Sequence, residues 1–193
     1  MSSAREPWGP PSMIASDVDG TLLDQHDRIT ARTRRVLERA RAQNVELILA
    51  TGRPPRWIPE ISEQLADGPA AVRYAVCANG AIVYDVQADE LLHVNALSAD
   101  VLRRLAALVY ETLPGAGLAA ERPARVVGNG GDAATAPFVA TPGYEHAWLN
   151  PDHVEVSDDV VFAEPAVKLL ARKPGMTSRE MAALLAPQVG DLA

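Results

Sequence analysis

Three short apolar runs, each stopped by glycine or by polar residues, most constrain the fold of this chain. They lie at residues 13–16, 45–50 and 74–78, and the segments between them can form helices. Short apolar runs bounded by such breakers are typical of buried strands. Strands that alternate with helices predict right-handed crossovers and a parallel sheet. The first half of the chain is therefore predicted to be an α/β domain.

The connections between these runs carry their own signals. A helix capped by the threonine at its start is predicted over residues 30–42, and a second helix over residues 57–65. The third run stops at Asn79-Gly80, a strong hairpin turn signal. Residues 81–86 are therefore predicted to continue as an extended strand.

The pattern changes after residue 86, so a second domain is predicted over residues 87–193. A serine-capped helix is predicted over residues 98–113, strands at 160–162 and 166–171, and a helix with a capping box from residue 177 to about residue 186. These elements mix without regular strand–helix alternation. The second half is therefore predicted to be an α+β unit.

The first apolar run ends at a pair of aspartates, Asp17 and Asp19, followed by Gly20. Residues i and i+2 of an extended strand point the same way, so the two carboxylates should emerge together at the strand's carboxyl end. In open α/β sheets that end is where ligands bind. Two adjacent carboxylates repel unless a cation or a shared proton relieves them. The pair indicates a metal-assisted catalytic site, although a solvated turn is an alternative.

Two further loops follow neighbouring strands and should border the same site. Thr51, Gly52 and Arg53 offer a hydroxyl, free backbone amides and a positive charge, which suit a phosphoryl group. Asn79 and Gly80 follow the third strand, where a plain hairpin turn is also a sufficient explanation. All five are predicted to bind phosphate or substrate.

Composition narrows the classes of partner and the compartment. The 193 residues carry a net charge of −7, which disfavours nucleic acid and anionic membrane as main partners. Cys77 is the only cysteine, so no internal disulfide is expected. Residues 1–12 resemble a flexible tail and lack the apolar core of a signal peptide. A cytoplasmic protein is expected, and its oligomeric state is open.

Three motifs together resemble those of the haloacid dehalogenase-like (HAD) hydrolase superfamily, and more narrowly its Cof-type branch with a class IIB cap. They are DVDGTLL at residues 17–23, LILATGR at residues 47–53 and CANGA at residues 77–81. The resemblance covers residues 13–84 well and residues 87–193 more loosely. It implies a Rossmann-like core followed by an inserted α+β cap domain.

The resemblance also implies a phosphatase chemistry that uses Mg²⁺ and a small phosphorylated metabolite. Asp17 would attack phosphorus and form an aspartyl-phosphate, and Asp19 would protonate the leaving oxygen and then activate water. Asp17 and Asp19 would also hold the metal, Asp19 through its backbone carbonyl. Thr51 would bind the phosphoryl group, helped by the amides near Gly52.

Two parts of the family pattern are not found in the sequence. The family uses a third-motif lysine and a fourth motif of the Gly-Asp-x-x-x-Asp type, but the only lysines are Lys168 and Lys173, in a cap-like strand and the turn after it. A truncated chain that contains part of the core and an incomplete cap is therefore expected. Its first strand would lie at an exposed edge of the sheet.

Alternative functions stay open at this point. A catalytically incompetent HAD-fold fragment or binding module would keep the first motif without turnover. A phosphomutase or another HAD phosphotransferase would keep the fold and change the reaction. Arg122, Arg125 and Arg172 could meet an anionic substrate, but surface solvation is the expected role of each. The substrate itself is not readable from the sequence.

Overall fold

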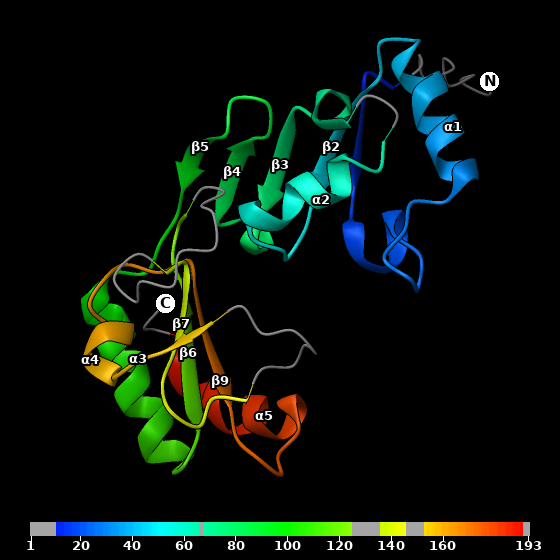
Figure 1. The fold of residues 1–193 in the computed structure, drawn as a ribbon. Coiled ribbons are helices and arrows are strands. Elements are labelled where there is room, and N and C mark those ends of the chain that lie inside the picture. Colours follow the sequence, from blue (N-terminus) through cyan, green and yellow to red (C-terminus); the bar gives the residue numbers. More distant parts are fainter. Residues whose placement is uncertain (1–10, 66–67, 125–135, 146–152, 191–193) are drawn as a thin grey trace, which may run out of the picture. The chain divides into compact units, whose positions relative to one another are not determined.

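The protein has two compact units, Met1–Leu92 and His93–Ala193, here called the N-terminal and C-terminal units. Each contains its own sheet, as Figure 1 shows. The structure is a computed structural model that describes residues 11–65, 68–124, 136–145 and 153–190. The division predicted after residue 86 falls between two strands of the first sheet.

The N-terminal unit is built on a five-stranded sheet. Its helices and strands are β1 (Met13–Ser16), α1 (Ala31–Arg41), β2 (Glu46–Ala50), α2 (Ile58–Ser62), β3 (Tyr74–Cys77), β4 (Ile82–Asp85) and β5 (Glu90–Val94). The strand order is β1-β2-β3-β4-β5, with β1, β2 and β3 parallel and β4 antiparallel to β3. This confirms the α/β fold, the three predicted strands and the hairpin after the third.

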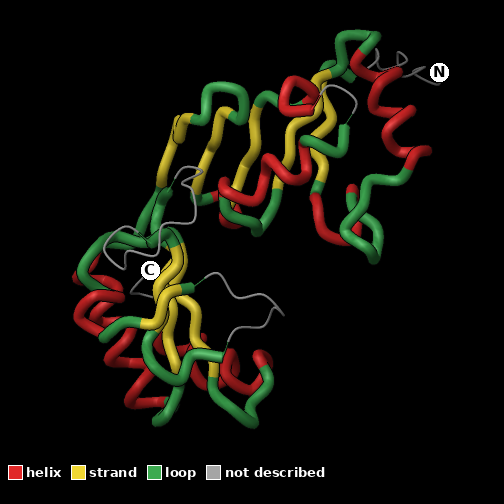
Figure 2. The backbone as a smooth tube through the Cα atoms, viewed as in Figure 1, coloured by secondary structure: helices red, strands yellow, loops and turns green. Residues whose placement is uncertain are grey.

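The C-terminal unit packs helices on one face of a four-stranded sheet. Its elements are α3 (Ala99–Thr112), β6 (Gly117–Glu121), β7 (Phe138–Ala140), β8 (Val154–Glu155), α4 (Asp158–Val161), β9 (Lys168–Arg172) and α5 (Ser178–Val189). The strand order is β8-β7-β6-β9. Figure 2 shows this sheet as the second group of yellow segments. Leu102 of α3, Leu118 of β6 and Met181 of α5 are buried in one apolar cluster. The helices therefore cover the same face of this sheet.

Local capping signals correctly predicted where three helices begin. The side chains of Thr30, Ser98 and Thr177 accept hydrogen bonds from backbone amides at the starts of α1, α3 and α5. At α5 the Glu180 side chain also accepts from the Thr177 backbone amide, at 2.8 Å, which completes the predicted capping box. Caps depend on residues within one turn, so they are readable from sequence.

One predicted strand was wrong. Residues 160–162 were expected to be extended, but Asp158–Val161 forms the short helix α4. Ser157 takes the extended conformation that precedes a helix, and Asp158 and Asp159 place negative charge in its first turn, where the helix dipole favours it. Val161 is buried in the apolar cluster of the unit. Local charge and burial therefore outweighed the strand preference of the valines.

Helix α1 and strand β1 bury less than their sequences suggest. No residue of α1 is buried, and Val36 is 55% exposed. A pocket of about 380 Å³ is lined by residues of α1 and by residues of all three parallel strands, including Leu37, Ile14 and Leu47. Strand β1 pairs with β2 and comes first in the sheet order, so it lies at the sheet's edge among the described residues. This agrees with the exposed edge predicted for that strand.

The second predicted helix is shorter than expected, since α2 ends at Ser62 rather than at residue 65, and a separate tight helical turn, Pro55–Trp57, precedes it. Cys77 is buried at the end of β3. Within the described ranges, none of the helices combines the length and the apolar character needed to cross a lipid bilayer.

Candidate active site

The turn after β1 places two carboxylates at the carboxyl end of the parallel strands. Val18 and Leu22 are buried and anchor this turn, and the backbone amide of Leu23 donates to the carbonyl of Val18 at 2.9 Å. Asp17 and Asp19 flank Val18 and are exposed. Exposed and buried positions alternate from Asp17 to Asp19, so both carboxylates face solvent at the strand end.

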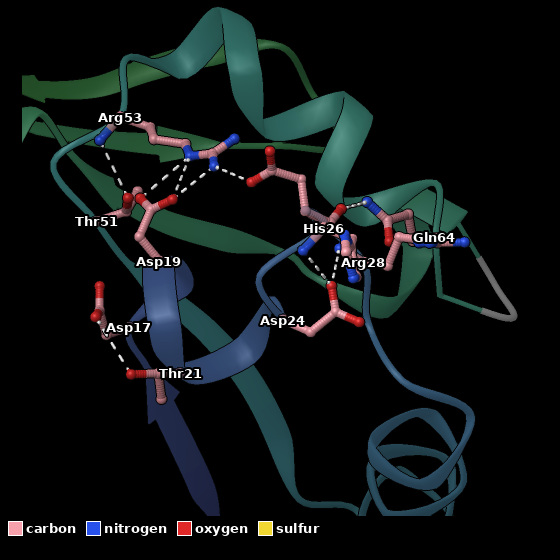
Figure 3. A network of polar contacts seen from close by, with 10 residues as sticks. Asp17, Asp19, Thr21, Asp24, His26, Arg28, Thr51, Arg53 and Gln64 are labelled. Carbon is pink, nitrogen blue, oxygen red and sulfur yellow. Dashed lines mark hydrogen bonds and ion pairs between the residues drawn. The ribbon is translucent and has the colours of Figure 1, made fainter. Parts of the chain in front are cut away.

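The Asp17 carboxylate accepts a hydrogen bond from within its own turn. The Thr21 hydroxyl donates to Oδ2 of Asp17 at 3.3 Å, and Figure 3 shows the two side chains facing each other. Gly20 between them has φ +73°, a conformation that costs glycine little. The Gly-Thr pair of the motif therefore bends the chain back and brings a hydroxyl to the first aspartate.

The loop after β2 is held by its neighbour, β3. Thr51 is only 6% exposed, and its backbone amide donates to the Val76 carbonyl at 2.8 Å. Its side-chain Oγ1 accepts a hydrogen bond from the Arg53 backbone amide at 3.1 Å. Because that hydroxyl accepts within the loop, its own proton can be donated to a bound oxygen.

The loops after β2 and β3 are joined directly, as the sequence predicted for two loops bordering one site. The amide of Asn79 donates to the Thr51 carbonyl at 3.1 Å, and the amide of Ala78 donates to the Arg53 carbonyl at 3.0 Å. Ala78, Asn79 and Gly80 all have positive φ angles, of 52°, 59° and 98°. Ala and Asn adopt this region at a cost, and such strain persists where surrounding contacts fix the backbone. These bonds place Thr51, Arg53 and Asn79 in one loop cluster.

Arg53 makes contacts that the sequence did not predict. Figure 3 shows its side chain extending to Asp19. Its Nη2 lies 2.6 Å from Oδ1 of Asp19, and its Nε donates to both carboxylate oxygens at 3.1 and 3.2 Å. The same Nη2 lies 3.1 Å from Oδ1 of Asp27, and the guanidinium carbon lies 5.9 Å from the Trp57 ring centre. Hydrogen bonding to Asp19 raises the pKa of Arg53 above its usual value.

Arg53 was predicted to contact phosphate, whereas in this structure its guanidinium binds two carboxylates. A phosphoryl group would have to share or displace these contacts to reach it. Asp27 belongs to no recognised motif and is separated from Arg53 by a helix and a strand, so no local signal pointed to it. Only the folded chain brings the two residues together.

The donor set at this strand end suits Mg²⁺, which prefers oxygen ligands and is commonly held by one or two carboxylates with substrate phosphate and water. Asp17 and the Asp19 carbonyl are oxygen donors in the same exposed turn. Among the described residues, no group of three or more His, Cys, Asp or Glu side chains is arranged to hold a metal. Asp17 and Asp19 therefore fit the ion only if substrate and water complete its shell.

Candidates outside this cluster lie in the C-terminal unit. Lys168 belongs to β9, and Lys173 follows it. Arg122 was expected to be solvated at the surface, but it is only 6% exposed and donates from Nη2 to the Val160 carbonyl at 2.7 Å. This buried contact links β6 to α4, so the surface assignment for Arg122 was wrong. Arg172 is half-buried, and Arg125 lies outside the described residues.

His153 packs against two other aromatic rings. It makes edge-to-face contacts with Phe138 and Tyr144, with ring centres 6.0 and 5.7 Å apart. Burial raises the pKa of Tyr144, and nearby Arg172 partly offsets the shift. Phe138 and Tyr144 are buried in an apolar cluster of the unit, and half-buried His153 packs against their rings.

Comparison with known proteins places the chain among hydrolases. The model of the haloacid dehalogenase-like hydrolase family matches residues 14–190. YxeH of Bacillus subtilis (strain 168) is 34% identical over 103 residues, which cover 51% of this chain and 36% of that protein. The pyridoxal phosphate phosphatase YbhA of Escherichia coli (strain K12) is 35% identical over 86 residues, which cover 44% of this chain and 30% of that protein. The matched part thus spans about a third of the length of these curated relatives.

Solved structures share the fold at low sequence identity. A haloacid dehalogenase-like hydrolase from Bacteroides thetaiotaomicron superposes with a TM-score of 0.66 at 18% identity, over 95% of this chain and 66% of that one. The HAD subclass IIB sugar phosphatase BT4131 gives a TM-score of 0.62 at 19% identity, over 90% of this chain and 62% of that one. The Cof-type branch predicted from the motifs agrees with these relatives.

Proposed function

This chain belongs to the haloacid dehalogenase-like hydrolase family, and we propose that it contributes the nucleophile and the phosphate-binding loops of a Mg²⁺-dependent phosphatase acting on a small phosphorylated metabolite. The observation that carries the proposal is the meeting of the loops after β2 and β3, joined by the hydrogen bond from Asn79 to Thr51, at the sheet edge from which Asp17 and Asp19 emerge. Phosphatase names among the relatives support it.

In the first step an Oδ atom of Asp17 attacks phosphorus, and the bond from phosphorus to the ester oxygen breaks. The protonated carboxyl of Asp19 gives its proton to that oxygen, so the metabolite leaves as an alcohol and Asp17 carries the phosphoryl group. In the second step Asp19 takes a proton from water, whose oxygen attacks phosphorus. The Asp17–phosphorus bond breaks, and inorganic phosphate leaves.

The loop residues would hold the phosphoryl oxygens during both steps. The transition state spreads negative charge over these oxygens, so fixed donors and positive charge supply most of the rate. Thr51 can donate its hydroxyl proton, and Gly52 exposes a backbone without a side chain. A bound Mg²⁺ would neutralise part of the phosphoryl charge and orient the ester for in-line attack.

The test measures phosphate release from p-nitrophenyl phosphate by the purified chain, with Mg²⁺ and with EDTA. We expect turnover only with Mg²⁺, and a loss of about a thousandfold or more in the Asp17→Asn variant, since the amide is a poor nucleophile. Asp89→Asn, at an exposed β4–β5 turn, is the matched control and should keep wild-type activity. Equal rates in wild type and Asp17→Asn would reject the nucleophile assignment. No turnover by the wild-type chain would favour the catalytically incompetent alternative.

A further inference from the structure

The loop from residue 24 to residue 29 has a defined structure next to the candidate active site. Oδ1 of Asp24 accepts from the backbone amides of His26 and Arg28, at 2.8 and 3.0 Å, as Figure 3 shows. The Asp24 amide donates to the Arg28 carbonyl at 2.9 Å, and the Asp27 amide donates to the Asp24 carbonyl at 3.1 Å. These backbone and side-chain bonds close a tight turn, so the direction of each side chain on it is fixed.

Gln64 fastens this turn to the segment just after α2. Its Nε2 donates to the backbone carbonyl of Asp27 at 3.0 Å, and its Oε1 accepts from the backbone amide of Ile29 at 2.9 Å. Ile29 is also buried, which adds an apolar contact at the end of the turn. The turn is therefore held from both sides of Asp27.

Asp27 has a backbone conformation that is unfavourable for most residues. Its φ is +55°, in the left-handed region, where a side chain costs energy unless the surroundings fix it. Its carboxylate is 80% exposed, so burial does not explain the arrangement. Its Oδ1 accepts a hydrogen bond from Nη2 of Arg53, at 3.1 Å.

Arg53 thus lies between two carboxylates. It contacts Asp19 through Nε and Nη2 and Asp27 through Nη2, while Trp57 lies beside the guanidinium. A guanidinium presents its donors in a rigid planar fork, so fixing one edge restricts the direction of the others. The orientation of the Asp19 carboxylate therefore depends on what else holds Arg53.

We propose that Asp27 is a positioning residue: it fixes the Arg53 guanidinium, which in turn fixes the Asp19 carboxylate for proton transfer. This inference rests on the proposed function for its catalytic consequence. The contact chain Asp27–Arg53–Asp19 can be measured without turnover.

The kinetic test compares two substrates in the Asp27→Asn variant. Asparagine tolerates left-handed φ, so the turn is kept while the charge is lost. Nitrophenolate leaves readily without a proton, whereas an alkoxide does not. A misdirected Asp19 should therefore lower kcat by about threefold to tenfold for glycerol phosphate and by less for p-nitrophenyl phosphate, with KM nearly unchanged.

Two comparisons separate positioning from a general structural effect. Asp89→Asn makes the same change at another left-handed aspartate, with φ +50°, and should leave both rates unchanged. In an Arg53→Ala background, Asp27→Asn should have no further effect, because the residue that links Asp27 to Asp19 is gone. Equal losses for both substrates, or an undiminished effect without Arg53, would overturn the proposal.

A spectroscopic test covers the case in which the chain shows no turnover at all. The Nε–H resonance of Arg53, assigned by its absence in Arg53→Lys, should be protected from solvent exchange in the wild type because it donates to Asp19. Asp27→Asn should shift or broaden it, and Asp89→Asn should not. An unchanged resonance in Asp27→Asn would refute the role of Asp27 independently of whether the proposed phosphatase activity is found.

Discussion

A Cβ atom on Gly52 would lie 2.6 Å from Oδ1 of Asn79, so these two loop residues touch with no space for a side chain at position 52. The contact joins the loop after β2 to the loop after β3. Both loops carry residues predicted to bind phosphate, so their spacing should affect activity as well as stability.

Gly52→Ala should push the Asn79 amide out of place. The clashing atom is at the end of a side chain that can rotate, so the loss of folding free energy should be limited to about 1 kcal/mol. The rate should suffer more, with kcat/KM falling by roughly tenfold because phosphate-contacting groups are displaced. Chemical denaturation and steady-state kinetics measure the two effects. Combining Gly52→Ala with Asn79→Gly should restore stability, and a failure to do so would place the clash elsewhere.

Asn79 itself has φ +59°, so its replacements should rank by their tolerance of the left-handed region. Asn79→Ala should destabilise the chain by about 1 kcal/mol, whereas Asn79→Gly should be nearly neutral. Thermal unfolding of the two variants tests this. If alanine and glycine gave the same midpoint, the backbone at residue 79 would not be strained.

Gly117→Ala should be far more damaging than Gly52→Ala. A Cβ at Gly117 would lie 2.4 Å from the backbone nitrogen and Cα of Tyr144, which cannot rotate away. The turn after β7 would have to move away from the start of β6, at a cost of about 3 kcal/mol or more. Denaturant titration followed by near-ultraviolet circular dichroism measures the loss. Gly190→Ala is the control, since a Cβ there meets no atom within 4 Å.

Tyr110 should make stability depend on alkaline pH. Burial, together with its 2.7 Å hydrogen bond to Oδ2 of Asp158, raises the pKa of Tyr110 to about 12 from the ordinary value of 10. The folded state therefore binds the phenol proton more tightly than the unfolded state. Its contribution is fully present below pH 10 and is lost as pH rises toward 12.

The measurement compares wild type with Tyr110→Phe by urea unfolding from pH 8 to pH 11.5. The variant should be less stable by about 1 kcal/mol at pH 8, because the hydrogen bond is lost, and the difference should shrink above pH 10. Tyr74→Phe, in the other unit, controls for general alkaline effects. A difference that stayed constant across this range would contradict the assignment.

Much of the fold follows from patterns that span only a few residues. The apolar runs gave the positions of β1, β2 and β3, and Asn79-Gly80 gave the hairpin to β4. The strand predicted at 160–162 was wrong because the side chains of Val160 and Val161 do not by themselves decide between an extended and a helical backbone. Burial of Val161 in the cluster that includes α3, together with the acidic residues in the first helical turn, favoured the helix.

Some residues of the candidate site were also readable from local patterns, and others were not. Asp17, Asp19 and Thr51 were identifiable because each follows a strand, and strand ends are local features. The two carboxylate partners of Arg53 were not identifiable, because the direction of a long flexible side chain depends on what the fold places around it. Asp27 carried no signal of its own, and only the turn fastened by Gln64 brings it to Arg53.

The sequence by itself determined the parallel strands, the three loops at their carboxyl ends and the two aspartates, because hydrophobic periodicity and breaker residues act over short distances. The tertiary structure alone decided which loops touch, that Arg53 binds Asp19 and Asp27, and that Arg122 is buried. These outcomes depend on contacts between residues far apart in the chain, whose geometry exists only after the strands have paired.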